Sequence, residues 1–181
     1  MDIIFTPWRQ PYITGKKEPG CILCEKHALP AEKDAENLVL WRGHACYVLL
    51  NRYPYTNGHM MIAPYDHLAS LELLAPPVAN ELTALGQFCL LVLRRAYHPE
   101  GFNLGINIGR VAGAGVPEHV HMHVVPRWGG DVNFMSAVAD TRLIPEDLGQ
   151  TLERLSEAWR EEMASRRALP GEPPKRRRSR P

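Results

Sequence analysis

The 181-residue sequence lacks the features that mark several large classes of protein. It has no stretch of eighteen consecutive apolar residues, so we expect no membrane-spanning helix. Residues 1–7 have neither a basic start nor a long apolar run, so we expect no secretion signal and a cytoplasmic location. Hydrophobic residues make up 45% and charged residues 23% of the chain. This balance is typical of a globular protein and excludes a wholly disordered or fibrous one.

Cysteine is scarce, and only two of the four cysteines lie close together. Cys21 and Cys24 form a C-x-x-C pair, which in a reducing compartment indicates a metal-binding or redox pair rather than a structural disulfide. Such a pair supplies only half of the four ligands that a closed zinc site needs. Cys46 and Cys89 lie in apolar runs, so we expect both in the core.

Positive charge is concentrated at the C-terminal end, although the net charge is only +1. Residues 170–181 include five lysines and arginines, four prolines and one acid. This composition cannot bury enough apolar surface to offset its ordering entropy, so it predicts a disordered basic tail. A solvated end is the preferred interpretation, and contact with nucleic acid is the alternative. We therefore divide the chain into a segment 1–37 with the cysteine pair, one domain over 38–169, and the tail 170–181.

Hydrophobic periodicity predicts a mixture of strands and helices. Residues 45–50 and 58–63 are short apolar runs around a turn-rich segment, which favours a β-hairpin. Apolar residues at steps of three and four predict one helix that starts at Pro76 and a second over 148–163. Residues 1–37 are rich in turn residues and are expected to be irregular. We predict an α+β fold in which an antiparallel sheet of about five strands carries two main helices on one face.

The most informative segment is 119–126, where histidine alternates with apolar residues. Successive side chains of a strand point to opposite faces, so His119, His121 and His123 are expected to share one face. Val120, Met122 and Val124 then share the other face, which the helices can bury. The segment 102–109 alternates in the same way and places Asn107 on its polar face. Three imidazoles in a row indicate a nucleophilic site or a zinc site, and a purely structural role is the less favoured interpretation.

The run His119-Val120-His121-Met122-His123-Val124-Val125-Pro126-Arg127 resembles the signature of the histidine triad (HIT) family. The resemblance covers roughly residues 40–135 and includes Asn51, Gly58-His59, Asn107 and the glycine-rich turn 110–115. Residues 128–134 and the segment 6–9 resemble the branch that contains the bacterial diadenosine tetraphosphate phosphorylases.

This resemblance implies a nucleotidyl transferase or hydrolase that acts at the α-phosphate of dinucleoside polyphosphates such as diadenosine tetraphosphate. His121 would attack phosphorus and form a nucleotidyl-histidine intermediate, with His119 and His123 as flanking catalytic groups. The substrate contacts that we expect come from Asn51, His59, Asn107, Gly113, Ala114, Gly115 and Trp128. An ordinary packed aromatic is an equal alternative for Trp128. The glycine turn lacks the hydroxyl or amide side chain that many family members carry there. Assistance to the leaving group must then come from main-chain amides, Asn107 or water.

The resemblance also completes the zinc half-site. The matching positions are histidines, so it implies a structural zinc site formed by Cys21, Cys24, His67 and His119. His119 would then fix the segment that holds His121 instead of donating to substrate. Two free thiols and a surface His67 are the alternative. The nearby His27 would not be a ligand, and His44 and His98 are expected at the surface.

The resemblance implies a homodimer, and Mg²⁺ is expected to accompany the polyphosphate substrate. The alternative functions are a nucleoside phosphoramidate hydrolase with the same nucleophile, a non-catalytic nucleotide-binding sensor, and a zinc-dependent hydrolase.

Overall fold

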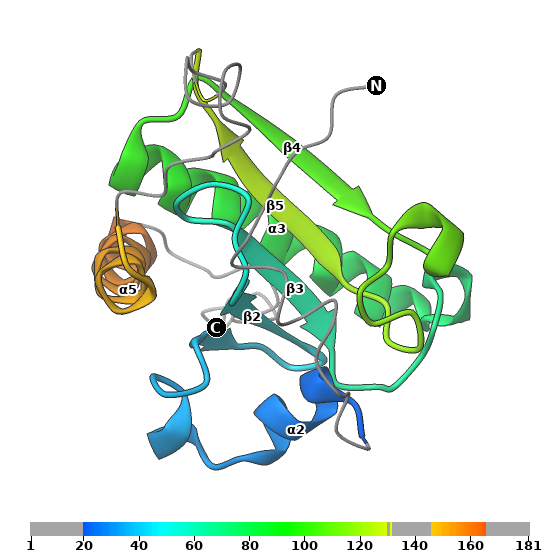
Figure 1. The fold of residues 1–181 in the computed structure, drawn as a ribbon. Coiled ribbons are helices and arrows are strands. Elements are labelled where there is room, and N and C mark those ends of the chain that lie inside the picture. The colour runs from blue at the N-terminus through cyan, green and yellow to red at the C-terminus, as the bar shows by residue number, and fades with distance from the viewer. Residues whose placement is uncertain (1–19, 130, 132–145, 166–181) are drawn as a thin grey trace, which may run out of the picture.

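A computed structural model describes residues 20–129, 131 and 146–165 of the chain. Five strands form one antiparallel sheet in the spatial order β1-β2-β3-β5-β4 (Figure 1). They are β1 (Val39–Arg42), β2 (Cys46–Leu50), β3 (Met60–Pro64), β4 (Gly101–Ile106) and β5 (Met122–Arg127). The predicted α+β fold and the predicted hairpin, which consists of β2 and β3, are confirmed.

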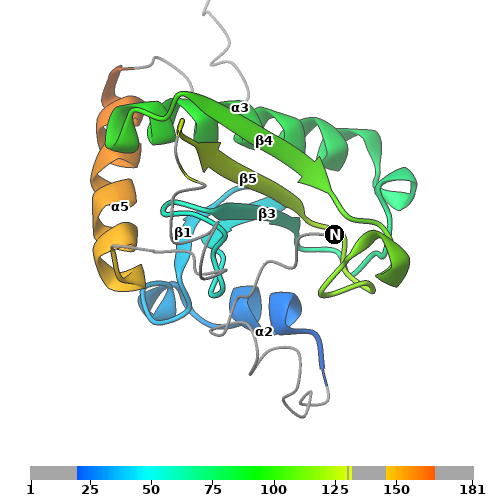
Figure 2. The same ribbon diagram turned by 45° about the horizontal axis from the view of Figure 1, so that its top comes forward.

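Two long helices cover one face of the sheet, as the periodicity predicts. They are α3 (Pro76–Tyr97), which begins at the expected proline pair, and α5 (Leu148–Ser165). The helix α5 packs against α3 and β1 (Figure 2). Trp159 of α5 stacks on Trp41 and contacts the edge of Phe88. Cys46 and Cys89 are fully buried in this core, as predicted.

The opposite face of the sheet carries a short helix, α2 (Ile22–Ala28). The expectation that residues 1–37 are irregular is therefore wrong for this part. A helix of seven residues is too short to show a repeat in the sequence, and tertiary contacts hold it. The hydroxyl of Tyr47 donates to the carbonyl of Leu23 at 2.7 Å, and Arg42 donates to the carbonyl of His27 at 2.8 Å. Leu23 packs with Tyr47 and Leu49 in a second, smaller core.

The histidine segment enters the sheet later than its alternation predicts. The strand β5 begins at Met122, where it pairs with Ile62 of β3, so His119 and His121 lie before the ladder. The main chain there bonds elsewhere, and the Val120 amide donates to the carbonyl of Leu68 at 2.6 Å. The alternation of faces nevertheless continues. Val120 and Val124 are buried under α3, whereas His121 and His123 line a cleft on the other face.

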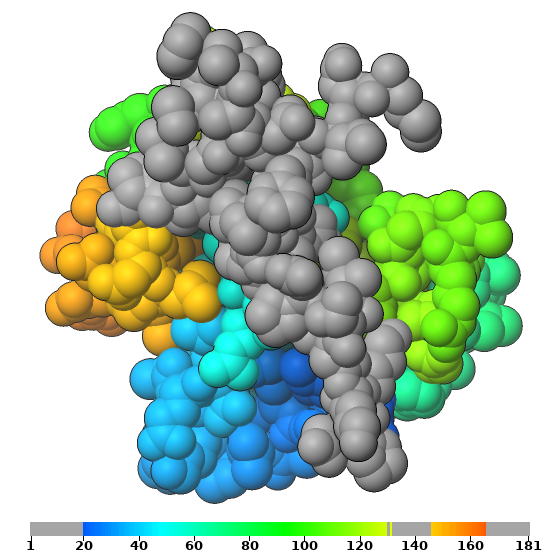
Figure 3. All heavy atoms as spheres, in the orientation of Figure 1, coloured from blue at the N-terminus to red at the C-terminus, as the bar shows by residue number. Residues whose placement is uncertain are grey.

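The strand β4 forms one edge of the sheet and ends at Ile106, three residues before the predicted end. Leu104 and Ile108, which share the apolar face of the predicted strand, are exposed, and no further strand pairs with this edge within the described residues. The segment around η4 (Arg110–Ala112) and the helix α5 lie at opposite sides of the molecule, with α2 below them (Figure 3).

The fold bears on the predicted positions of two histidines and on the prediction about membrane-spanning helices. His44 and His98 are exposed, as expected. Among the described residues, no helix combines the length and the apolar character that crossing a bilayer requires. The tail 170–181 and the segment 6–9 lie outside the described residues.

Candidate active site

A cleft lies between α2, the sheet and the glycine turn, and we call it the histidine cleft. Its described lining includes Leu23, Lys26, Leu49, Asn51, Arg52, Tyr55, Met61, Gly113, Gly115, His121 and His123. Both later triad histidines therefore face one cavity together with the glycine turn. His119 does not line this cavity, because its side chain points to the cysteine pair.

His121 is held in one orientation and one tautomer. Its Nδ1–H donates to the main-chain oxygen of His119 at 2.8 Å, and a carbonyl oxygen can only accept. Nε2 therefore carries the lone pair of the neutral ring. The side chain is 4% exposed, and burial lowers the pKa of His121 although its bond to the carbonyl acts in the opposite direction. A buried neutral imidazole with a fixed lone pair is suited to nucleophilic attack.

A chain of hydrogen bonds fixes the tautomer of His123. The amide of Tyr55 donates to Nδ1 of His59 at 3.1 Å, so His59 carries its proton on Nε2. That nitrogen lies 3.0 Å from Nδ1 of His123 and donates to it. A neutral His123 then carries its proton on Nε2. The ring of Tyr55 stacks on His59 with centroids 4.8 Å apart, which holds the ring plane of His59. His123 lies against His121, with their ring centroids 4.9 Å apart.

The glycine turn brings main-chain groups to the same cleft. Gly113 has a φ of 87°, a conformation that favours glycine over residues with a Cβ. Asn107, which follows the end of β4, lies beside it, since a Cβ on Gly113 would be 3.9 Å from the Asn107 amide nitrogen. Gly113 and Gly115 both line the cleft, and Ala114 lies between them. The expectation that the amides of Gly113 and Ala114 face a phosphate is wrong, because both donate within the turn, to the carbonyls of Arg110 at 3.0 Å and Gly109 at 3.3 Å. The turn therefore offers a phosphate the main-chain amide of Gly115 and the side-chain amide of Asn107.

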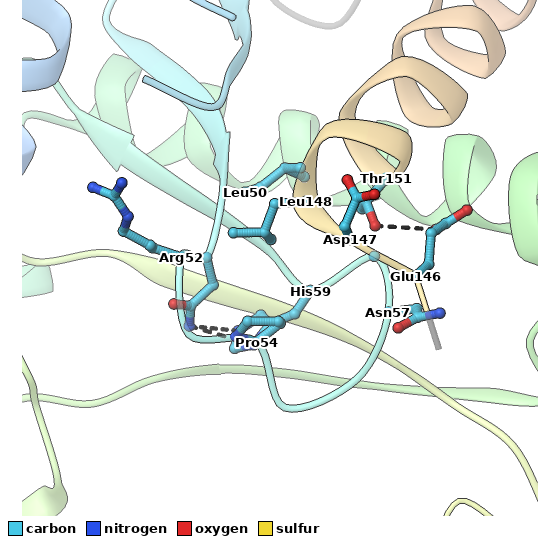
Figure 4. A pocket seen from close by; sticks show the side chains of 11 residues that line it. Leu50, Arg52, Pro54, Asn57, His59, Glu146, Asp147, Leu148 and Thr151 are labelled. Carbon is cyan, nitrogen blue, oxygen red and sulfur yellow. Dashed lines mark hydrogen bonds between the residues drawn. The ribbon is translucent and has the colours of Figure 1, made fainter. Parts of the chain in front are cut away.

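The loop 51–59 borders the histidine cleft and also a second pocket, which Figure 4 shows. Asn51 borders both cavities, and its side-chain oxygen accepts from the Tyr53 amide at 2.9 Å. The second pocket lies between this loop and the start of α5, where Glu146 accepts from Thr151. Glu146 also accepts from Tyr97 and Arg154, so its carboxylate anchors α5. This pocket reaches His59 but neither His121 nor His123.

A cluster of two thiols and two imidazoles lies beside the cleft. It consists of Cys21, Cys24, His67 and His119, whose ligand atoms all lie within 4.8 Å of one another. Nδ1 of His119 is 3.3 Å from the sulfur of Cys21 and 3.4 Å from that of Cys24. Nδ1 of His67 is 3.2 Å from the sulfur of Cys24. Tetrahedral zinc bonds of about 2.3 Å to sulfur and about 2.0 Å to nitrogen place such atoms about 3.5 Å apart.

The surroundings of the cluster also fit a metal. Nε2–H of His119 donates to the carbonyl of Pro64 at 2.9 Å, so Nδ1 presents its lone pair to the two sulfur atoms. Burial, reinforced by Cys21, raises the pKa of the Cys24 thiol, so a metal would displace a proton on binding. His27 is outside the cluster, as expected, and contacts the rings of Tyr47 and Tyr65.

Comparison with known proteins decides the family. The HIT domain family model matches residues 32–130. An AP-4-A phosphorylase of Mycobacterium tuberculosis is 38% identical over 162 residues, which is 86% of this chain and 83% of that protein. The chain belongs to the HIT domain family.

Two further relatives place this HIT domain in context. A zinc-bound histidine triad family protein of Mycobacterium smegmatis has a TM-score of 0.65 and 26% identity, and the match covers 81% of this chain and 98% of that one. A bis(5'-nucleosyl)-tetraphosphatase (asymmetrical) of Schizosaccharomyces pombe is 29% identical over 89 residues, which is 49% of this chain and 48% of that protein.

Trp128 is the predicted site residue of this HIT domain that lies apart from the others. It follows β5, seven residues beyond His121, and an extended chain covers roughly 20 Å over that length. Its ring contacts the edge of Tyr97.

Sequence reasoning missed several groups that line the cleft of this HIT domain, among them Lys26, Arg52 and Tyr55. Lys26 is buried at 8% exposure, and burial, followed by the positive charge of Arg52, lowers the pKa of its ammonium. Lys26 lies near the histidines because it is on α2. The sequence gives no signal for α2, because a helix of seven residues is too short to show a hydrophobic repeat.

Proposed function

We propose that this HIT domain protein is a dinucleoside polyphosphate phosphorylase that works through a nucleotidyl-His121 intermediate. The orientation of His121 carries the proposal, because the bond from its Nδ1–H to the His119 carbonyl leaves the Nε2 lone pair as the nucleophile. The 38% identity to an AP-4-A phosphorylase over most of both chains supports diadenosine tetraphosphate as the substrate.

The first step forms a bond between Nε2 of His121 and the α-phosphorus of diadenosine tetraphosphate. The bond from that phosphorus to the bridging oxygen breaks, and ATP leaves with the electron pair. In the second step an oxygen of inorganic phosphate attacks the adenylyl group, and Nε2 of His121 takes back the electron pair. The second product is ADP, whereas attack by water would give AMP.

The neighbouring groups have separate roles in these steps. The Nε2 proton of His123 donates to a non-bridging oxygen of the α-phosphate, and the bond from His59 keeps that proton on Nε2. The main-chain amide of Gly115 and the side chain of Asn107 hold the rest of the polyphosphate near Gly113. Asn51 contacts the nucleoside from the loop above the cleft.

The thiol and imidazole cluster supports a structural zinc site in this chain. Cys21, Cys24, His67 and His119 would hold the ion, and four protein ligands leave no open position for substrate. Zinc would supply rigidity rather than chemistry at phosphorus. It would join α2 to His119, whose main-chain oxygen orients His121. Mg²⁺ bound to the polyphosphate stays a prediction.

The exposed edge of the sheet supports a homodimer. Leu104, Ile108 and Val111 are exposed along or just beyond β4, and an open strand edge with apolar side chains is suited to pairing with a second copy. Such a pair would continue the sheet from one protomer into its partner.

Incubation with labelled diadenosine tetraphosphate, with and without inorganic phosphate, tests the reaction. We expect ADP and ATP in the presence of phosphate, and an acid-labile adenylyl group on the protein in its absence. His121→Ala should form neither product nor adduct, whereas His44→Ala at an exposed histidine should behave as wild type.

Other products would point to the other functions. AMP and ATP in the presence of phosphate would indicate hydrolysis. Faster turnover of adenosine phosphoramidate would indicate a phosphoramidate hydrolase. AMP binding without an adduct would indicate a sensor. An active His121→Ala variant would overturn the nucleophile assignment.

A further inference from the structure

The histidine cleft has an apolar end, which the register of the sheet defines. Leu49 pairs with Met61 and Met61 pairs with His123, so the three residues form one row across β2, β3 and β5. Two strand spacings of about 4.8 Å put Leu49 about 10 Å from His123. Leu23 of α2 lines the same end of the cavity. Leu49 is fully buried and Met61 is half-buried, so a nucleoside whose phosphorus lies at His121 can place its base against Met61, beneath α2.

The side chain of Lys26 places a cation at this apolar end. Lys26 lines the cleft one helical turn after Leu23, and only 8% of its surface is exposed. Its ammonium donates to the main-chain oxygen of Asn37 at 2.8 Å. Within the described part of the chain Lys26 forms no ion pair with a carboxylate. An ammonium has three N–H donors, so this single bond leaves capacity for a ligand.

A buried cation without an anionic partner is costly to the folded protein. Burial is the main cause of the lowered pKa of Lys26, the positive charge of Arg52 in the same cleft adds to it, and the negative charge of Glu25 opposes it. An apolar residue in place of Lys26 would pack against Leu23 without this cost. A ligand that accepts a hydrogen bond at this point offsets it.

We propose that Lys26 is a specificity-determining residue that donates a hydrogen bond from its ammonium to an acceptor atom on the edge of the nucleobase. The assignment rests on the proposed nucleotide function. The acceptor belongs to the base rather than to the phosphates, because the phosphates lie at His121 and the glycine turn, whereas Lys26 lies on α2, one helical turn after Leu23. For adenine the acceptor is one of the ring nitrogens N1, N3 and N7.

Binding of AMP and its deaza analogues tests the proposal without any chemical step. Isothermal titration would measure the Kd of AMP, 1-deaza-AMP, 3-deaza-AMP and 7-deaza-AMP for wild type, Lys26→Met and Lys33→Met. Methionine keeps the length of the side chain and removes the donor. Lys33 is an exposed lysine that pairs with Glu36, so Lys33→Met is the matched control.

We expect wild type and Lys33→Met to bind one of the three analogues about 10-fold more weakly than AMP, the effect of one charge-assisted hydrogen bond. Lys26→Met should bind AMP about 10-fold more weakly than wild type, and it should no longer distinguish AMP from that analogue. Lys26 also tethers α2 to Asn37, and loss of that tether would weaken all four ligands equally without removing the discrimination.

Several results would overturn the assignment. They are an unchanged affinity of Lys26→Met for AMP, discrimination that persists in Lys26→Met, and a wild type that binds all four ligands equally. Wild type that discriminates among the bases but never forms an adenylyl adduct would overturn the proposed reaction and leave the role of Lys26 intact. A wild type that binds no AMP would overturn both.

Discussion

Substitution of His59 tests whether the hydrogen-bond chain behind His123 matters for catalysis. His59→Phe keeps an aromatic ring that can stack on Tyr55 and removes both nitrogens from a side chain that is 1% exposed. The Tyr55 amide loses its acceptor at 3.1 Å, and His123 loses its donor at 3.0 Å. A buried polar group that loses its partner costs about 1–3 kcal/mol, so we expect the free energy of unfolding to fall by about that amount.

The effect on catalysis follows from the tautomer of His123. Without the donor from His59, the His123 proton is no longer fixed on Nε2, the position that stabilises charge on the phosphoryl oxygens. We expect kcat to fall about 10-fold to 100-fold, which corresponds to about 1.4–2.7 kcal/mol, and KM to change little. Steady-state kinetics with diadenosine tetraphosphate and urea unfolding would measure both effects.

The same replacement at an exposed histidine, His44→Phe, is the control and should keep wild-type kcat. A folded His59→Phe enzyme whose kcat lies within about twofold of wild type, a difference of about 0.4 kcal/mol, would refute the reasoning. The tautomer of His123 would then have no role in the rate-limiting step.

Three further predictions concern pH, metal and assembly. Burial lowers the pKa of His121, so the acidic limb of kcat/KM should lie below the usual histidine value of about 6.5, and a limb centred above it would contradict a buried neutral nucleophile. The unfolded chain protonates this histidine at a higher pH than the folded chain does, so its contribution should lower the unfolding free energy in urea as pH falls from about 6.5 to the folded pKa. Cys24→Ser should lower both the Tm and the zinc content that atomic absorption measures. The control Cys89→Ser, which is remote from the cluster, should keep its zinc. Equal zinc in both variants would exclude Cys24 as a ligand. Leu104→Asp on the exposed edge should convert a dimer to a monomer in light scattering, and a wild-type monomer would remove the dimer proposal.

Much of this architecture follows from local patterns in the sequence. The helices α3 and α5 repeat apolar residues at three and four positions, and each repeat requires a buried stripe whatever it packs against. The alternation from His119 to Val124 likewise predicts that the imidazoles lie on one face and the core residues on the other. This holds even though His119 and His121 lie before the start of β5. Such periodic patterns persist because the geometry of a helix or an extended chain fixes side-chain direction over a few residues.

The remaining features depend on contacts between segments far apart in the chain. The helix α2 exists because Tyr47 and Arg42 bind its carbonyls, and neither contact leaves a trace in residues 22–28. Its position brings Cys21 and Cys24 to His67 and His119, a set that spacing alone could not assemble. The tautomer of His121 depends on the main-chain carbonyl of His119, and the tautomer of His123 depends on His59. The burial of the Lys26 ammonium depends on the position of α2 beside the cleft. Hydrogen-bond partners and burial are properties of the packed molecule, so only the fold assigns a direction and a proton to each of these side chains.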